Sequence, residues 1–290
     1  MGAQTPPLSD REQPGYTAAF DDWLPSFFEG LAADAPDGLN AEDLQNISVK
    51  KYLQASAEIE MPADDRLRFL AIGIEEAIEY IDVLIDPYGK WLAADRIFNE
   101  AIRVDPDYGP HHSSRGLSAH YMLHHKMGDK QRSELVAVAK SASLRGTELD
   151  PSCKAFSIAG QCHYQDDTTK SLELYEDALQ LDSDALWPLL FRAHCLHDLE
   201  RYAEAKAAYG QVPLGRLTGS RSWRLEALRN QLAACQLHLG ELTEARAAFE
   251  AILNRYESQP HLAAGTPMRY LREAAEVWPE LAPRIDAVDI

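Results

Sequence analysis

Several classes of protein are excluded by what this 290-residue sequence lacks. It contains no run of about 18 apolar residues, which a membrane-spanning helix requires. Its first residues, MGAQTPPLSDREQPGY, have neither a basic start nor an apolar core, so we expect no secretory signal. Pro6 stands where a myristoylation motif requires Ser or Thr. These absences favour a cytoplasmic protein.

Motifs of catalysis and cofactor binding are also missing. The sequence has no glycine-rich phosphate loop, no GxSxG elbow and no dinucleotide-binding fingerprint. The run His111-His112-Ser113-Ser114 is a nucleophile–base pair only in sequence, because adjacent residues of a helix do not face each other. The four cysteines form no CxxC pair, so we expect free, buried thiols in a reducing compartment. We therefore predict neither enzyme activity nor a cofactor.

Positive charge is scarce, and the net charge is −18. Residues 1–110 carry 22 acidic and 8 basic side chains, so most of the excess lies there. Such an acidic segment repels phosphates, which argues against nucleic acid and against anionic membranes as partners. Two explanations of the acidic segment stay open: a solvated surface, or a docking surface for a basic partner.

What the sequence does contain is a repeat. Between Ser152 and Gly219, two consecutive 34-residue segments match when one is shifted onto the other. Ala159 aligns with Ala193, Ser171 with Ala205, and Tyr175 with Tyr209. The small residues of the first two pairs let two antiparallel helices approach closely. The aromatic residues of the third pair fill the space between neighbouring units. One helix pair cannot bury its apolar face alone, so the units must stack.

This pattern resembles the tetratricopeptide repeat (TPR) family, over roughly residues 75–259. The resemblance implies an all-α, right-handed superhelical solenoid of helix–turn–helix repeats with flanking helices. It also implies a binding scaffold whose first helices line a concave groove, without naming a partner.

The resemblance predicts three segments. Residues 1–74 form an acidic amino-terminal segment with a disordered start, followed by capping or docking helices, and 260–290 form a carboxyl-terminal capping helix and tail. Between them, 75–259 hold five repeats: 75–108, 109–151, 152–185, 186–225 and 226–259. Asp82 departs from the pattern because a small residue belongs there. Gly116 supplies the small residue of the second repeat, and Asp166-Asp167 precedes the second helix of the third as a helix-start signal.

Histidines recur at one place in successive repeats. His163 and His197 are 34 residues apart, and His120 falls in the same place when Gly116 is aligned with Ala159. Aromatic and imidazole side chains suit the binding of a peptide, because they offer contact area and hydrogen bonds. The predicted peptide-binding residues are His120, Tyr121, Phe156, His163, Tyr164, Trp187, His194, His197, Asn230 and His238. The alternative is that these side chains only pack between helices.

Two other clusters are weaker. Arg216, Arg221, Arg224 and Arg229 lie in and after an inserted loop, where they either contact an anionic group or remain solvated. The pair His120/His124 and the pair His194/His197 each share a helix face, but two histidines do not complete a zinc site. We predict no metal.

The favoured hypothesis is an adaptor or scaffold that holds a protein or peptide partner in the concave groove, with no nucleic acid and no membrane involved. A second hypothesis is a self-assembling structural protein, with the groove occupied by its own amino-terminal helices and a homo-oligomer as its state. A third, a metal-dependent enzyme using the groove histidines, has the least support.

Overall fold

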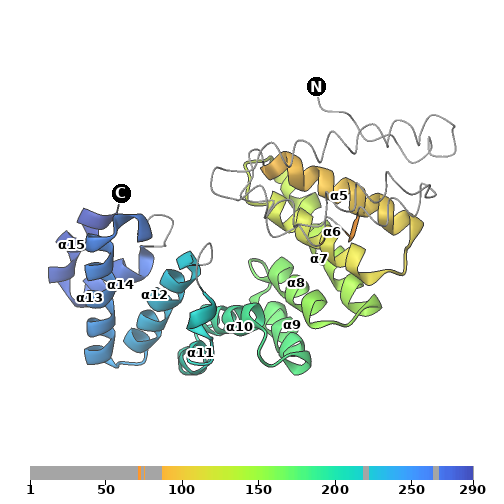
Figure 1. Cartoon of the computed structure of the whole chain (residues 1–290). Coiled ribbons are helices and arrows are strands. Elements are labelled where there is room, and N and C mark those ends of the chain that lie inside the picture. The colour runs from red at the N-terminus through yellow and green to blue at the C-terminus, as the bar shows by residue number, and fades with distance from the viewer. Residues whose placement is uncertain (1–70, 73–74, 76–86, 218–221, 264–267, 290) are drawn as a thin grey trace. The chain divides into compact units, whose positions relative to one another are not determined.

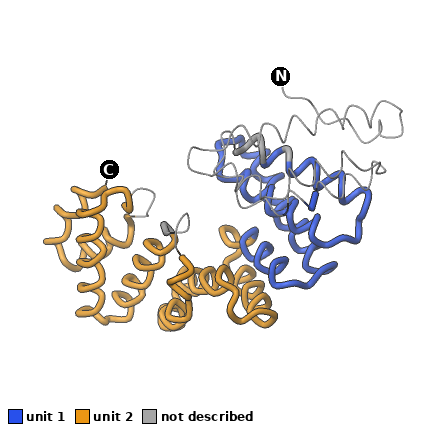
Figure 2. Tube along the Cα trace, in the orientation of Figure 1, with its two compact units in different colours: residues 1–162 blue, residues 163–290 orange. Residues whose placement is uncertain are grey.

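The structure, a computed structural model, describes residues 71–72, 75, 87–217, 222–263 and 268–289. These residues form helices, turns and connecting loops, with no strand among them (Figure 1). The expected helices before residue 71, the departure at Asp82 and the side chain of Arg221 lie outside this part of the chain. Two compact units, residues 1–162 and 163–290, divide the molecule, and each is described by itself (Figure 2).

Unit 1 contains α5 (Pro87–Val104), α6 (Gly109–Met122), α7 (Asp129–Leu149) and nearly all of α8 (Cys153–His163). The inner face of α5 consists of Trp91, Ala94, Phe98 and Ala101, all fully buried, as their helical spacing predicts. Pro110 lies in the first turn of α6, where its missing N–H costs no hydrogen bond. The extra length of the second repeat is taken up largely by α7, which has 21 residues against 14 in α9.

The hairpin of α6 and α7 is held by close approach of the two backbones. A Cβ atom added to Gly116 would lie 2.8 Å from the backbone nitrogen of Ser143. A Cβ on Gly146 would lie 2.8 Å from the backbone nitrogen of Ser113, and one on Gly109 would meet Asp150 at 2.6 Å. These distances are shorter than real Cβ contacts allow. Gly116 is therefore the close-packing residue that the repeat pattern predicts. Gly146 of α7 allows the same close approach from the other helix.

Unit 2 contains the remaining helices in chain order. They are α9 (Thr168–Leu181), α10 (Leu186–Asp198), α11 (Tyr202–Tyr209), α12 (Ser222–His238), α13 (Leu242–Ser258), α14 (Arg269–Val277) and α15 (Ala282–Val288), with short 3₁₀ turns at Leu214–Arg216, Pro260–Leu262 and Pro279–Leu281. Helix α14 lies within residues 260–290, where a carboxyl-terminal helix is expected. Asp167 caps α9, because its carboxylate accepts a 3.0 Å hydrogen bond from the backbone N–H of Lys170.

The core of unit 2 shows why small and aromatic residues alternate in the repeat. Ala193 on α10 and Ala205 on α11 are fully buried, while Tyr175 and Tyr209 fill the spaces around them. A second cluster, containing Phe249, Tyr256 and Leu271, joins α12 and α13 to α14 and α15. Burial of such side chains is the main favourable term in the stability of stacked hairpins.

The turns inside the hairpins of unit 2 share one backbone conformation. Glu200, between α10 and α11, has φ 57°, and Gly240, between α12 and α13, has φ 76°. Only glycine adopts this left-handed conformation without a steric penalty, so Glu200 carries strain that Gly240 avoids. The tight turns leave α10 and α12 as first helices of their hairpins, with α14 packed beside α12.

Candidate functional site

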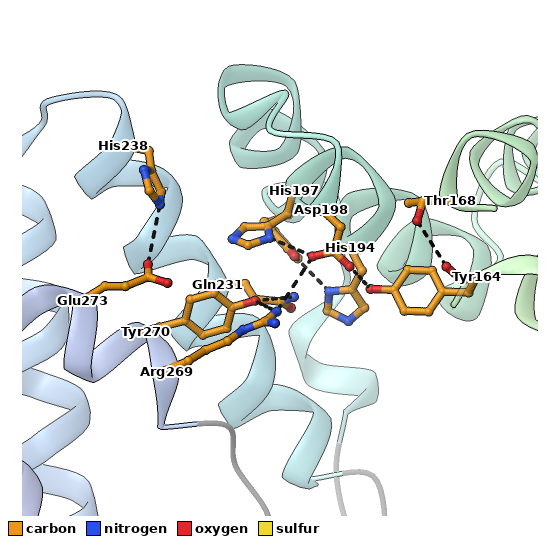
Figure 3. A network of polar contacts seen from close by, with 11 residues as sticks. Tyr164, Thr168, His194, His197, Asp198, Gln231, His238, Arg269, Tyr270 and Glu273 are labelled. Atoms are coloured by element: carbon orange, nitrogen blue, oxygen red, sulfur yellow. Dashed lines mark hydrogen bonds and ion pairs between the residues drawn. The ribbon is translucent and has the colours of Figure 1, made fainter. Parts of the chain in front are cut away.

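A set of polar side chains lies on α10, α12 and α14, at the start of α9 and on the turn after α8 (Figure 3). Helix α12 neighbours both α10 and α14, which brings side chains from distant parts of the sequence together. We call this set the polar network. It comprises Tyr164, Thr168, His194, His197, Asp198, Gln231, His238, Arg269, Tyr270 and Glu273.

Asp198, the last residue of α10, is the centre of the polar network. Its Oδ2 accepts a 2.5 Å hydrogen bond from the hydroxyl of Tyr164, and its Oδ1 accepts a 3.0 Å bond from Nδ1 of His197. The guanidinium of Arg269 lies 3.9 Å from Oδ1. Burial tends to raise the pKa of the Asp198 carboxyl, but these donors outweigh it and the pKa is lowered. Asp198 is therefore a stable carboxylate at neutral pH.

His197 is held between two phenol rings. Its imidazole makes edge contacts with Tyr202, at a centroid distance of 5.6 Å, and with Tyr270, at 5.2 Å. A carboxylate only accepts hydrogen bonds, so Nδ1 of His197 is protonated and donates the hydrogen bond to Asp198. The other ring nitrogen, Nε2, is buried and has no hydrogen-bond partner among the described residues. In the neutral imidazole, Nε2 is a buried acceptor without a donor.

His194 lies one turn earlier on α10 and behaves differently. Its Nδ1 is 2.8 Å from the hydroxyl of Tyr209. Burial, reinforced by the nearby positive charge of Arg224, lowers the pKa of His194 to about 3. This imidazole is therefore neutral at physiological pH, and it contributes hydrogen bonding without charge.

Helix α14 supplies the other side of the polar network. The hydroxyl of Tyr270 accepts hydrogen bonds from Nε2 of Gln231, at 3.3 Å, and from the guanidinium of Arg269. Burial raises the pKa of Tyr270 above its ordinary value. The ring of Tyr270 is almost fully buried, whereas the Arg269 side chain is 61% exposed. Arg269 therefore presents its charge to solvent beside the buried Tyr270 ring.

An aromatic cluster adjoins the polar network on α10. Arg224 lies over Phe191, with 5.1 Å from its guanidinium carbon to the ring centroid, and over Trp187, at 5.9 Å. Phe191 also stacks on Tyr175 and meets the edge of Tyr164. Trp187, which also contacts Phe191, is half-buried. These contacts are cation–π and aromatic contacts of the kind that recur at protein interfaces.

His238 closes the face at the end of α12. Its ring stacks on Tyr202 with centroids 4.2 Å apart and an 8° angle between planes. Nε2 of His238 lies 3.6 Å from the carboxylate of Glu273 on α14. The His238 side chain is 38% exposed, so a ligand can reach it without rearrangement.

The predicted site residues are only partly brought together. Tyr164, Trp187, His194, His197 and His238 gather on one face of unit 2, and His163 is buried in the same unit. His120, Tyr121 and Phe156 belong to unit 1, where Tyr121 stacks on Trp91 with centroids 4.6 Å apart.

Asn230 is fully buried, and its amide donates to the hydroxyl of Tyr256 at 2.8 Å. This amide joins α12 to α13 and belongs to the packing between them.

The predicted arginine cluster has no common centre. Arg216 donates to the backbone carbonyl of Asp184 at 2.9 Å, and Arg229 donates to the buried carboxylate of Glu226 at 2.6 Å. Glu226 also accepts a 2.6 Å hydrogen bond from Arg255 of α13. Arg224 lies over the aromatic rings of α10. Each described arginine thus has its own partner.

Much of the polar network escaped prediction, including Asp198, Gln231, Arg269 and Tyr270. Asp198 directly follows a histidine already singled out, so the pair itself was the available signal. Arg269 and Tyr270 lie beyond the last repeat, and no periodicity places them opposite α10.

Metal and thiol chemistry find little support in this part of the chain. No group of three His, Cys, Asp or Glu side chains among the described residues is placed to hold a metal ion. The four cysteines are free thiols. Burial raises the pKa of Cys162, Cys195 and Cys235 to about 12 each, so these three act as small apolar side chains. Within the described residues, no helix combines the length and apolar character needed to cross a bilayer.

Comparison with protein-family models gives no match, and comparison with curated proteins gives none either. Among solved structures, the chain is similar to a thermophilic TPR protein of Thermus thermophilus, at 16% identity and a TM-score of 0.44, over 72% of this chain and 97% of that one. It is also similar to the APC/C hetero-tetramer Cut9-Hcn1, at 14% identity and a TM-score of 0.50, over 98% of this chain and 56% of that one. The chain thus spans little more than half of the latter's length, and at this identity the likeness concerns the fold alone.

Proposed function

We propose that this chain, an all-α protein with the tetratricopeptide-repeat fold, is a protein-interaction module that binds a partner peptide on the α10–α12–α14 face of unit 2. The observation that carries the proposal is the polar network, which concentrates imidazole, phenol, carboxylate and guanidinium groups on one face. The α6–α7 hairpin, by contrast, packs through small residues such as Gly116, Ser143 and Gly146.

In this proposal the exposed groups make first contact and the buried groups give specificity. Half-buried Trp187 offers an apolar surface at the start of α10, and His238 and Arg269 offer hydrogen bonds and charge at the ends of α12 and α14. Aromatic and arginine side chains dominate the energetics of many protein interfaces. The module acts without catalysis and without a cofactor. Its cytoplasmic location and the division of 75–259 into five repeats remain predictions.

Selection of a displayed random peptide library on the immobilised full chain tests the proposal. Enriched peptides are then measured by fluorescence anisotropy against wild type, Trp187→Ala and His238→Ala. We expect about a tenfold loss of affinity in both variants, the effect of removing a contact of moderate strength. Arg246→Ala on α13 is the matched control, because Arg246 is exposed and its ion pairs, with Glu250 and Glu280, lie outside the polar network. Peptides that bind all four proteins equally would place the binding surface elsewhere.

Self-assembly is the second candidate, and exposed apolar side chains favour it. Leu239, Leu242 and Val277 are all exposed at the ends of α12, α13 and α14. Such residues are suited to contacts between copies of the chain. Light scattering over a range of concentrations tests this candidate: a constant monomer mass would contradict it, and a dimer lost on Leu242→Ser would support it.

A further inference from the structure

Two side chains of α14 occupy the centre of the polar network. Figure 3 shows Arg269 and Tyr270 pointing from α14 toward His197 and Asp198 at the end of α10. The Tyr270 ring meets the His197 ring at 5.2 Å, and the Arg269 guanidinium lies 3.9 Å from the Asp198 carboxylate. Helix α14 thus places a cation and an aromatic ring, from adjacent residues, on the face that α10 and α12 present.

The acceptors around these two side chains are not fully used. Nε2 of His197 and Oε1 of Gln231 are both buried and have no hydrogen-bond partner among the described residues. His197 is 6% exposed and Gln231 is 8% exposed. A buried acceptor without a donor costs free energy that a ligand can recover by supplying the donor. Asp198 is a third acceptor, and it carries a full negative charge.

The chemistry of these acceptors selects the ligand. Three acceptors, one of them charged, call for a cation that carries several N–H donors. Arginine has five donors in a planar fork and no acceptor, whereas lysine offers a single compact ammonium group. The Tyr270 ring already receives a guanidinium, because the Cζ atom of Arg269 lies 4.6 Å from its centroid.

We propose that Asp198, His197 and Gln231 form a recognition site for an arginine of a partner peptide, that Tyr270 is the aromatic wall of this site, and that Arg269 occupies its charged edge in the free chain. The inference rests on the proposed function, because it specifies the partner's chemistry at the same face. Arg269 is largely exposed and approaches Asp198 only at 3.9 Å, so a better-placed guanidinium can replace it.

The chain itself supplies the probe. A fluorescently labelled peptide with the sequence of residues 268–277, MRYLREAAEV, carries the same arginine and tyrosine. Its anisotropy is measured with full-length wild type, Arg269→Gln, Arg272→Gln and the double variant Asp198→Asn/Arg269→Gln. Arg272→Gln is the matched control, because Arg272 is equally exposed on α14 but pairs with Asp289. Circular dichroism melts confirm that each variant is folded.

We expect Arg269→Gln to bind the peptide about two- to fivefold more tightly than wild type, the size expected when a partly exposed ion-pair competitor is withdrawn. Arg272→Gln should bind like wild type. Adding Asp198→Asn should weaken binding by about tenfold or more, because a charged acceptor is lost. Probes whose first arginine is replaced by lysine or glutamine should bind progressively less well.

Equal binding of the arginine and glutamine probes would overturn the inference, and so would undetectable binding or an Arg269→Gln variant that binds no better than wild type. If Asp198→Asn fails to fold, the substituted probes still decide, because they leave the protein unchanged. The proposed function fails separately, when library selection yields no peptide sensitive to Trp187→Ala or His238→Ala.

Discussion

The α6–α7 hairpin of unit 1 and the α10–α12–α14 face of unit 2 solve the same packing problem in opposite ways. In the hairpin, glycines at 116 and 146 bring two backbones so close that a single added carbon would collide. On the face, large aromatic and polar side chains separate the helices and bond to one another. The first arrangement packs helices through small residues, whereas the second brings larger polar side chains together, and those of His238 and Arg269 are partly exposed. Hairpins of one repeat fold thus pack either through small residues or through larger polar side chains.

The largest expected effect is on the close-packed hairpin. Gly146→Ala should lower the free energy of unfolding by about 3 kcal/mol or more, because the new Cβ would lie 2.8 Å from the backbone nitrogen of Ser113 and would overlap its Oγ. Alanine ordinarily favours a helix over glycine by about 1 kcal/mol, so the sign itself is informative. Urea unfolding followed by circular dichroism measures it. Gly215→Ala, with no atom within 4 Å of its added Cβ, is the control; equal effects at both sites would refute close packing.

The next largest effect is the loss of stability in acid that His194, on the α10–α12–α14 face, should cause. The pKa of His194 is lowered from 6.5 to about 3 in the folded chain. Between these values the unfolded chain binds a proton that the folded chain does not, so stability falls as the pH falls. At pH 5 this amounts to about 2 kcal/mol relative to pH 7. We measure the free energy of unfolding by urea at pH 7 and at pH 5. In His194→Gln, the decrease between the two pH values should be smaller than in wild type by about 2 kcal/mol. An unchanged loss in the variant would mean that other groups govern acid sensitivity.

A smaller effect is expected at the centre of the polar network. Asp198→Asn should cost about 1 kcal/mol at pH 7, since Asp198 is partly exposed and its bonds are partly screened. Because the pKa of Asp198 is lowered, this contribution is present above the carboxyl's unfolded pKa and disappears as the pH falls through the folded pKa.

Tyr164→Phe removes one of the same hydrogen bonds, so a double-mutant cycle should be non-additive. Strict additivity of the two substitutions, measured by urea unfolding, would show that the two side chains act independently.

The smallest effect on stability is expected at His238. Removing its stack on Tyr202 with His238→Ala should cost only about 0.5 kcal/mol, because the His238 side chain is 38% exposed. The same substitution is expected to weaken peptide binding about tenfold. Thermal unfolding and peptide anisotropy on one sample separate the two roles. A variant that loses several degrees of melting temperature but no affinity would make His238 a structural residue.

The TPR fold predicted from the sequence is confirmed, and the reason is local. The 34-residue shift matches residues with the same role in successive hairpins, such as Ala159 and Ala193, which are both fully buried, and Asp167 caps α9 as expected. The candidate site was less accessible to prediction. Asn230 is fully buried because Tyr256 of the next helix binds its amide, and Tyr270 reaches His197 only through the placement of α14. Neither contact has a fixed spacing in sequence.

The buried thiols can report when the helices that carry them separate from their neighbours. Cys162, Cys195 and Cys235 lie on α8, α10 and α12, and their burial suppresses thiolate formation in the folded chain. Each becomes reactive only when its surroundings part, so brief exposure to an alkylating reagent marks whichever helix has separated. The wild-type sequence thus carries one cysteine reporter on each of three helices. Mass spectrometry of the alkylated peptides at successive times shows in which order these helices open, without any engineered probe.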